Sequence, residues 1–158
     1  MTRLATKALL ICLAIGSFSS CMKQEPIEVY RNMLAATEVG YEDGFVEGFS
    51  KRSQGVVRAL VRLSSAYGLD EQNPWALVSG DDAVEQEYIA DIALVRVKKG
   101  SKSKYQVLFI EDPDDDDAWR IDLDELEQFL DLGRKNYLKE RLRKERKEKA
   151  SKRRGEEP

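Results

Sequence analysis

Apolar residues recur at helical spacing between residues 26 and 68, and this pattern predicts three helices. The first begins at Pro26, because a proline in the first helical turn gives up no N–H group that the helix needs, and it ends or bends at Gly40. Gly68 is well placed to end the third helix. The apolar positions expected to face the core are, helix by helix, Val29, Tyr30, Met33 and Leu34; Tyr41, Phe45 and Phe49; and Val56, Leu60, Leu63 and Tyr67, with Val57 and Val61 beside this last stripe.

Beyond the Asn73-Pro74 breaker the pattern changes to that of strands. The strands are expected at residues 75–78, 85–98, 105–110 and 119–123, with turns at 100–103 and 111–118. The run 105–110 is apolar enough to be a central strand covered on both faces. Along 85–98, one face is expected to carry Ile89, Asp91, Ala93, Val95 and Val97, and the other Tyr88, Ala90, Ile92 and Leu94.

The chain closes with a short predicted helix that carries Leu123, Leu126 and Leu130, capped by Asp122 or Asp124. Helices that come first and strands that follow as a block favour an α+β fold. We therefore expect N-terminal helices packed on a curved antiparallel sheet of about four strands.

Composition limits the chemistry that this fold can carry. The chain has 158 residues, 42% of them hydrophobic and 35% charged, which fits one domain with a heavily solvated segment. It has no histidine, and its two cysteines, Cys12 and Cys21, both lie near the N-terminus. Imidazole bases, Ser-His-Asp triads and sites built on His or Cys ligands are thereby excluded from the rest of the chain. We expect no metal, no cofactor and no catalytic activity.

Residues 1–20 have the order of a secretory signal: Arg3 and Lys7, then the apolar run 8–15, then small residues. The apolar run has eight residues, against the roughly 20 that a transmembrane helix needs. The sequence Phe18-Ser19-Ser20-Cys21 resembles the lipobox of bacterial lipoproteins, with Phe18 in place of the usual branched aliphatic residue. The resemblance implies that Cys21 is lipidated and begins the mature chain, with 21–25 as a tether. The alternative is an ordinary cleaved signal with an incidental cysteine.

The position after Cys21 bears on the destination of such a lipoprotein. In the sorting rule of enteric-type bacteria, an aspartate there retains a lipoprotein at the inner membrane. Met22 stands at this position. The resemblance therefore implies a periplasm-facing protein in the cell envelope, at the outer rather than the inner membrane.

Charge divides the rest of the chain into two parts. Residues 22–133 hold 12 Lys and Arg against 24 Asp and Glu, a net charge of −12, whereas residues 134–158 hold 12 against 5, a net charge of +7. We expect 134–158 to be a basic tail, helical at first and disordered near Ser151. The tail is expected either to contact an anionic surface or an acidic protein, or only to keep the protein soluble. Nucleic acid would suit the charge but not the compartment.

The order of elements resembles the NTF2-like cone fold, in particular small bacterial lipoproteins of that group. The resemblance covers residues 26–123 and rests on Pro26 to Tyr30 in the first helix, on the segment 41–49, and on Ala118 to Leu123 in the last strand. It implies a domain at 26–133 in which a bent sheet wraps a helix and leaves a conical pocket. Enzymes of this superfamily use Asp, Tyr or His in that cone.

Three groups of residues are candidates for a site in such a domain. Asp91 would be a buried base with a raised pKa, or a carboxylate at a sheet edge or bulge. Tyr30, Trp75 and Tyr88 would line the pocket, or belong to the core. The acidic turn 111–117 would bind Ca²⁺, or be a solvated hairpin tip, since its acids are contiguous and it lacks the glycine of an EF-hand loop.

These observations favour a non-catalytic envelope lipoprotein whose NTF2-like domain binds a partner or a small ligand. Two alternatives stay open. In the first, the lipid at Cys21 and the basic tail at 134–158 form a structural tether between membrane and cell wall. In the second, the domain is an enzyme that uses a carboxylate in the cone.

Overall fold

The structure, a computed structural model, describes residues 23–69, 73–78, 82–100 and 103–154. The predicted signal segment 1–20, Cys21 and Met22 lie outside the described residues. No helix within the described ranges is both long enough and apolar enough to cross a membrane. In chain order the elements are α2 (Pro26–Val39), α3 (Glu42–Val46), α4 (Lys51–Tyr67), the 3-10 helix η2 (Pro74–Val78), β1 (Ala83–Ile89), β2 (Ile92–Lys99), β3 (Ser103–Asp112), β4 (Ala118–Arg120) and α5 (Leu123–Arg154).

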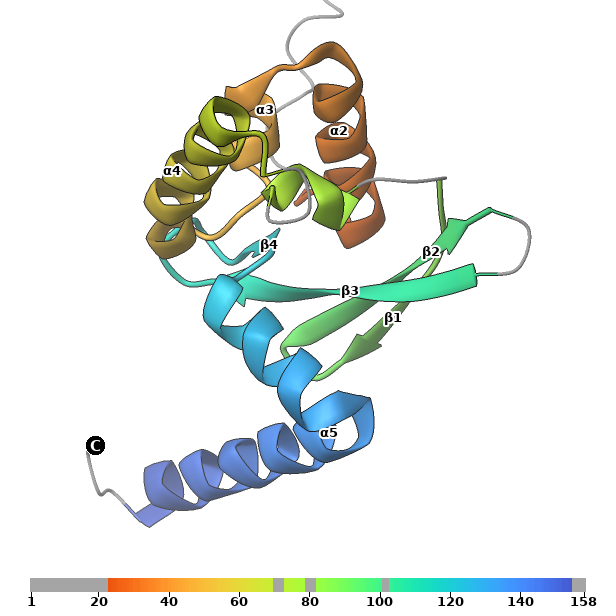
Figure 1. Cartoon of the computed structure of the whole chain (residues 1–158). Coiled ribbons are helices and arrows are strands. Elements are labelled where there is room, and N and C mark those ends of the chain that lie inside the picture. Colours follow the sequence, from red (N-terminus) through yellow and green to blue (C-terminus); the bar gives the residue numbers. More distant parts are fainter. Residues whose placement is uncertain (1–22, 70–72, 79–81, 101–102, 155–158) are drawn as a thin grey trace, which may run out of the picture.

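The sheet has four strands in the order β1-β2-β3-β4, and every pair is antiparallel. The helices α2, α3, α4 and η2 lie on one side of it, and α5 crosses the other side (Figure 1). The expected class, α+β with an antiparallel sheet of about four strands, is confirmed.

Each face of the sheet meets a different set of helices. Residues directly opposite in an antiparallel pair share a face, so Val97 and Tyr105 lie on the same one. The Tyr105 hydroxyl lies 2.9 Å from that of Tyr30 in α2, which places this face against the N-terminal helices. The other face carries Glu87, whose carboxylate lies 2.7 Å from Arg134 in α5. Because both faces are covered, residues 107–110 of β3 are all buried, as expected for a central strand.

The predicted strand over 85–98 is wrong: a turn at Ala90 and Asp91 divides it into β1 and β2. Ile89 pairs with Ile92, and Ala90 has a φ of 56°. Two-residue hairpin turns usually contain glycine or asparagine, and the Ala-Asp pair contains neither, so the sequence did not predict a turn here. The turn also changes the faces, because Ile89 now shares its face with Ile92 rather than with Ala93.

The strand predicted at 75–78 is also wrong, because Pro74–Val78 forms the 3-10 helix η2. The Asn73 side chain accepts the Trp75 N–H at 3.2 Å, and the Asn73 carbonyl accepts the Ala76 N–H at 2.9 Å. Asn and Pro next to each other favour such a turn, and this local preference outweighs the apolar run.

The core between α2, α3 and the sheet follows the predicted apolar pattern closely. Tyr30, Met33, Phe45 and Phe49 are fully buried, whereas Tyr41, expected on the same face as the two phenylalanines, is exposed. The Phe45 ring meets Phe49 edge to face at 5.3 Å, and it stacks on Trp75 at 5.4 Å.

α4 buries a different side from the one predicted. Its buried residues are Ser53, Val57, Val61 and Ser64, and the expected stripe of Val56, Leu60, Leu63 and Tyr67 is exposed. Two polar contacts fix this rotation. The Ser53 hydroxyl accepts the Leu123 N–H at 3.1 Å, and Arg62 reaches Glu42, the first residue of α3, at 3.0 Å.

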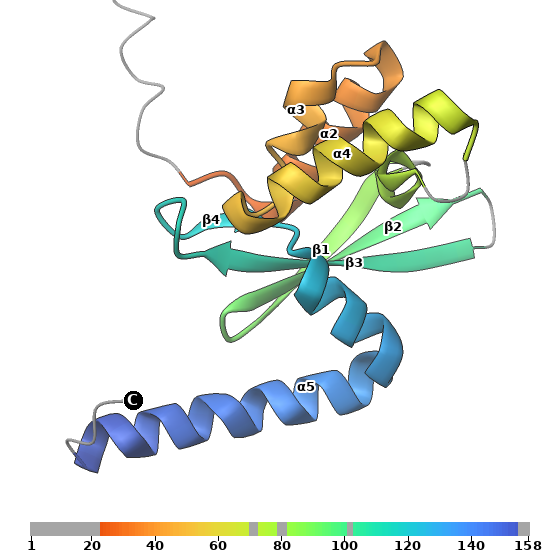
Figure 2. The ribbon, with the colours of Figure 1, turned by 60° about the vertical axis from the view of Figure 1, so that its left-hand side comes forward.

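The predicted short C-terminal helix is instead the first part of α5, which extends over 32 residues and is interrupted at Gly133. Gly133 has a φ of 69° and a ψ of 154°, a conformation that only glycine adopts readily. Beyond this break the helix turns and leaves the domain (Figure 2). Of the two predicted caps, Asp122 is the one used, because its carboxylate accepts the Glu125 N–H at 3.1 Å.

Candidate functional site

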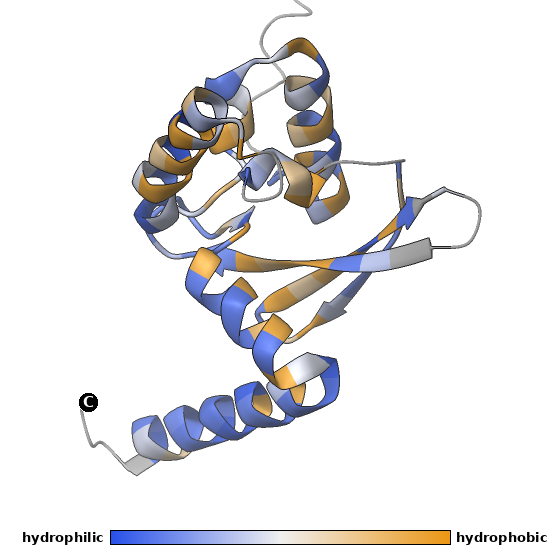
Figure 3. Cartoon of the chain, in the orientation of Figure 1, coloured by the Kyte–Doolittle hydropathy of each residue, from blue (hydrophilic) through white to orange (hydrophobic). Residues whose placement is uncertain are grey.

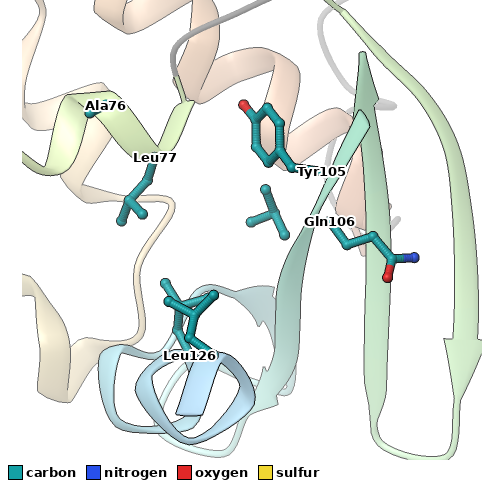
Figure 4. Close-up of a pocket in the computed structure, with 7 residues that line it drawn as sticks. Ala76, Leu77, Tyr105, Gln106 and Leu126 are labelled. Atoms are coloured by element: carbon teal, nitrogen blue, oxygen red, sulfur yellow. The ribbon is translucent and has the colours of Figure 1, made fainter. Parts of the chain in front are cut away.

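An apolar cavity of about 380 Å³ lies between η2, β3 and the first part of α5. Figure 4 shows Leu77 and Leu126 on opposite sides of this space, with Tyr105 at its edge. The lining residues are Ala76, Leu77, Tyr105, Gln106, Val107, Leu126 and Leu130.

The cavity forms where β4 is too short to continue the sheet. β4 pairs only with Ile110, Glu111 and Asp112 at the end of β3. α5 packs beside β3 at the part of the strand that β4 does not reach. A helix is wider than a strand and lies farther from its neighbour, so space remains between Leu126 of α5 and Leu77 of η2.

The inner surface of this cavity offers few polar groups. The Gln106 amide points away from it in Figure 4. The Tyr105 hydroxyl is hydrogen-bonded to Tyr30, with an oxygen–oxygen distance of 2.9 Å. Leu130 is 65% exposed and stands at the mouth. A cavity of this size is within the range of ligand sites, which hold about 300–1,000 Å³. The lining suits an apolar ligand.

Asp91, the predicted base, belongs to a different cluster, which joins the β1–β2 turn to α5. Arg141 lies 2.5 Å from the Asp91 carboxylate and 2.9 Å from that of Glu125, and the Tyr137 hydroxyl donates to Glu125 at 2.6 Å. Partial burial opposes ionisation of Asp91, but the hydrogen bond and charge of Arg141 outweigh it and lower its pKa. The hypothesis that Asp91 is a base with a raised pKa is therefore wrong.

The three aromatic residues predicted for the pocket do not line the cavity. Tyr30 is fully buried, and its hydroxyl is hydrogen-bonded to that of the lining residue Tyr105. Trp75 stacks on Phe45, and Tyr88 packs against Trp119 with 5.5 Å between ring centres. The alternative, that these residues belong to the core, holds for Tyr30. Trp75 is partly buried against the core, and Tyr88 is half exposed.

The acidic turn at 111–117 serves as a structural link. The Asp112 carboxylate is buried and accepts the Lys51 N–H at 2.8 Å, at the start of α4, and the Asp114 N–H at 3.1 Å. Asp115 lies 2.7 Å from Arg120 and 3.3 Å from Lys51. Among the described residues, no group of His, Cys, Asp and Glu side chains is arranged to hold a metal ion.

A buried polar cluster around Asp122 was not predicted beyond its role as a cap. Its carboxylate accepts hydrogen bonds from Ser50 at 2.6 Å and from Arg52 at 2.5 and 2.6 Å. Burial alone would raise the pKa of Asp122, but these bonds and the Glu125 N–H lower it to about 2. The cluster joins the start of α4 to the start of α5, and α5 forms one wall of the cavity.

The start of the basic tail is part of the fold. The sequence places residue 137 in the basic tail beyond the expected domain at 26–133, but Tyr137 is buried against Phe129, with 5.5 Å between ring centres. Arg141 adds its two ion pairs with the domain. From Leu142 to Arg153 most of the helix is exposed, and its charges face solvent.

The chain enters the domain beside β3 and β4. Lys23 lies 2.5 Å from the Glu111 carboxylate and 4.8 Å above the Trp119 ring. Trp119 is buried in the middle of β4. The predicted anchor, Cys21, is two residues before Lys23 in the sequence.

Comparisons of the chain with protein-family models, with curated proteins and with solved structures found no match.

Proposed function

We propose that this chain is a non-catalytic, lipid-anchored protein of the bacterial cell envelope whose α+β domain holds a small apolar ligand. The observation that carries the ligand part of the proposal is the cavity between η2, β3 and α5, with its aliphatic lining. The lipobox-like residues Ser19, Ser20 and Cys21 support the anchor.

The chemistry of the cavity favours an acyl chain or a similar flexible hydrocarbon. Burying each methylene group contributes about 0.8 kcal/mol, and the lining demands no polar partner from the ligand. Leu130 at the mouth can move without disturbing the core, because most of it is exposed. A polar head group attached to the chain would remain in solvent outside Leu130.

We further propose that the domain is an NTF2-like cone. The layer of N-terminal helices on an antiparallel sheet supports this fold (Figure 1).

A substitution that fills the cavity tests the ligand proposal. Leu130→Trp places an indole at the mouth of the cavity, and because Leu130 is exposed the variant should fold normally. Leu142→Trp is the matched control, since it lies on the same helix but does not line the cavity. We expect a dansyl-labelled fatty acid to bind to the native chain and to Leu142→Trp with similar affinity. Leu130→Trp should weaken binding at least tenfold, and equal affinity in the two variants would contradict the proposal.

The alternative of a tether between membrane and cell wall is favoured by one feature of α5. Its second half leaves the domain (Figure 2). This part of the helix is rich in Lys and Arg, and most of it is exposed. This arrangement suits an anionic surface or polymer at some distance from the domain, and it is compatible with a ligand in the cavity.

A further inference from the structure

The second half of α5 has one side that is fixed against the domain. Arg134 lies 2.7 Å from Glu87, Tyr137 is buried, and Arg141 lies 2.5 Å from Asp91. Residues three or four positions apart share one side of a helix, so these three contacts define the inward side. Because an α-helix turns about 100° per residue, they also determine which residues point away from the domain.

The side that points away from the domain carries a row of cations, which we call the cationic stripe. Its members lie within about 55° of the direction opposite the three contacts. All of them are exposed, and among the described residues none of them forms an ion pair. The members of the stripe are Lys135, Lys139, Arg143, Arg146 and Arg153.

The acidic residues of this part of the helix lie off the stripe. Glu140, Glu145 and Glu148 are each roughly 100° or more around the axis from its middle. Glu145 forms its ion pair with Lys149, which is not a member of the stripe. Figure 3 shows this half of α5 as mostly hydrophilic. A partner that approaches from the outer side therefore meets positive charge without intervening carboxylates.

Near its end the stripe is hollowed at Ala150. Ala150 lies on the same side of the helix, between Arg146 and Arg153. A hollow of about 460 Å³ is lined by these three residues and by Lys149. A guanidinium group binds phosphate oxygens through two parallel hydrogen bonds. Cations around a short side chain give this hollow the chemistry of a phosphate site.

The form of the stripe favours a chain-like partner over a membrane. A helix that lies on a membrane buries large apolar side chains beneath its cationic side, whereas here Tyr137 is buried in the domain and Leu142 is only 38% exposed. A flat anionic membrane responds to the number of cations near it and requires no single row. A linear polymer laid along the helix contacts one row only, and the stripe from Lys135 to Arg153 is about 27 Å long.

The charge of the remaining domain confines such a polymer to α5. Residues 22–133 have a net charge of −12, and a surface of this sign repels a polyanion. We propose that the cationic stripe binds a linear phosphate polymer along the outer side of α5, with one phosphate group in the hollow at Ala150. The proposal rests on the tether alternative, to which it adds the chemistry of the polymer, and it requires nothing of the cavity between η2, β3 and α5.

Two pairs of lysine substitutions in the full-length chain test the stripe. Lys135→Gln with Lys139→Gln removes two cations from it, whereas Lys144→Gln with Lys152→Gln removes two exposed cations from other sides of the same helix. Glutamine forms helices about as well as lysine, so both variants should fold. We expect the stripe pair to weaken binding of dye-labelled, long-chain inorganic polyphosphate at least tenfold. It should also reduce the slope of log K against log salt by about 1.4, at roughly 0.7 per lost contact. The other pair should change the affinity less than threefold.

A carboxylate in the hollow tests the phosphate site. Ala150→Glu should weaken polyphosphate binding at least tenfold, because it places a negative charge between Arg146 and Arg153. Ser151→Glu is the matched control, since it adds the same charge about 100° farther around the helix. It should weaken binding less than threefold. Equal effects of the two substitutions would reject the phosphate site in the hollow.

The same measurements contain the results that would overturn the proposal. A native chain that does not bind polyphosphate would reject both the stripe and the tether. Equal losses in the two lysine pairs would show that only net charge matters, which rejects the stripe but leaves the tether standing. Tighter binding to phosphatidylglycerol vesicles than to polyphosphate would assign this side of α5 to a membrane, and tighter binding to duplex DNA would assign it to nucleic acid. Dansyl-labelled fatty acid should bind equally to all variants, so the outcome is separate from that for the cavity.

Discussion

Single residues at the junction of α4 and α5 carry more of the fold than their sequence context suggests. Asp122 caps α5, accepts hydrogen bonds from Ser50 and Arg52, and is fully buried. A buried, ionised carboxylate without such partners would destabilise the folded protein. Several charge-assisted hydrogen bonds, as at Asp122, stabilise its ionised form instead. The junction of the helical layer with the cavity wall therefore depends on one charge.

The stability of the protein should consequently fall at acidic pH. The pKa of Asp122 is lowered to about 2 from 3.8, so its contribution is complete above about pH 4 and is lost as the pH falls toward 2. The difference corresponds to about 2 kcal/mol of unfolding free energy. Urea unfolding at pH 7 and at pH 3 should show about half of this loss, because the Asp122 carboxylate of the folded protein is still largely ionised at pH 3.

Asp122→Asn isolates this effect from that of the other carboxylates. It keeps the cap but removes the charge, so we expect about 1–3 kcal/mol less stability at pH 7. It should also show a smaller loss between pH 7 and pH 3 than the native chain. Asp124→Asn, exposed in the same turn, is the control and should behave like the native chain. Equal pH dependence in all three proteins would show that Asp122 is not the group that titrates.

At the scale of elements, α5 joins two roles in one helix. Its first part lines the cavity with Leu126 and Leu130. Its second part begins after the break at Gly133, is held to the domain by Tyr137 and Arg141, and then extends into solvent. The domain therefore needs the helix only as far as residue 141.

Deletion of residues 144–158 should separate these roles. The deleted helix is exposed and contributes surface pairs such as Glu145 with Lys149, so stability should change by less than about 0.5 kcal/mol. Tyr137→Ala, which opens a buried site, should cost about 3 kcal/mol and is the contrasting variant. If the second part acts as a tether, the deletion should also abolish salt-dependent binding to anionic vesicles or to cell-wall polymer. A large drop in melting temperature on deletion would place the whole tail in the fold, and unchanged binding would reject the tether.

At the scale of the whole molecule, the position of Lys23 relates the proposed anchor to the domain. Lys23 is held on Glu111 and Trp119, and Cys21 precedes it by two residues, a reach of about 7 Å at most. A lipidated Cys21 would bring the β3–β4 end of the domain close to the membrane. The basic second half of α5 starts instead from the side of the sheet opposite α2.

The proposed membrane anchor predicts that Cys21 is lipidated. Cells that express the chain should incorporate labelled palmitate into it, and the protein should sediment with the membrane. Cys21→Ala should abolish both, because the thiol is the atom that accepts the lipid. Cys12→Ala should retain both, since Cys12 lies in the apolar run of the signal. Release of the native chain as a soluble protein would contradict the prediction.

The sequence by itself determined the features that depend on local pattern. Apolar spacing located α2 and its buried Tyr30 and Met33, and the continuous apolar run located the central strand β3. Glycine and aspartate, with their specific backbone preferences, marked the end of α4 at Gly68 and narrowed the cap of α5 to Asp122 or Asp124, of which the structure uses Asp122. The α+β class followed from the order of these elements, and the charge division is visible in the sequence alone.

Only the tertiary structure decided how these elements meet. α4 has apolar residues on two sides, and its contacts with Asp122 and Glu42, distant in sequence, selected which side is buried. The β1–β2 turn at Ala90 and Asp91 lacks a local signal and depends on the pairing of β2 with both neighbours. The cavity arises because β4 is too short to pair with the rest of β3, and α5 packs beside that part of the strand instead. Periodicity records which residues are apolar, but contacts between distant segments determine which of them face one another.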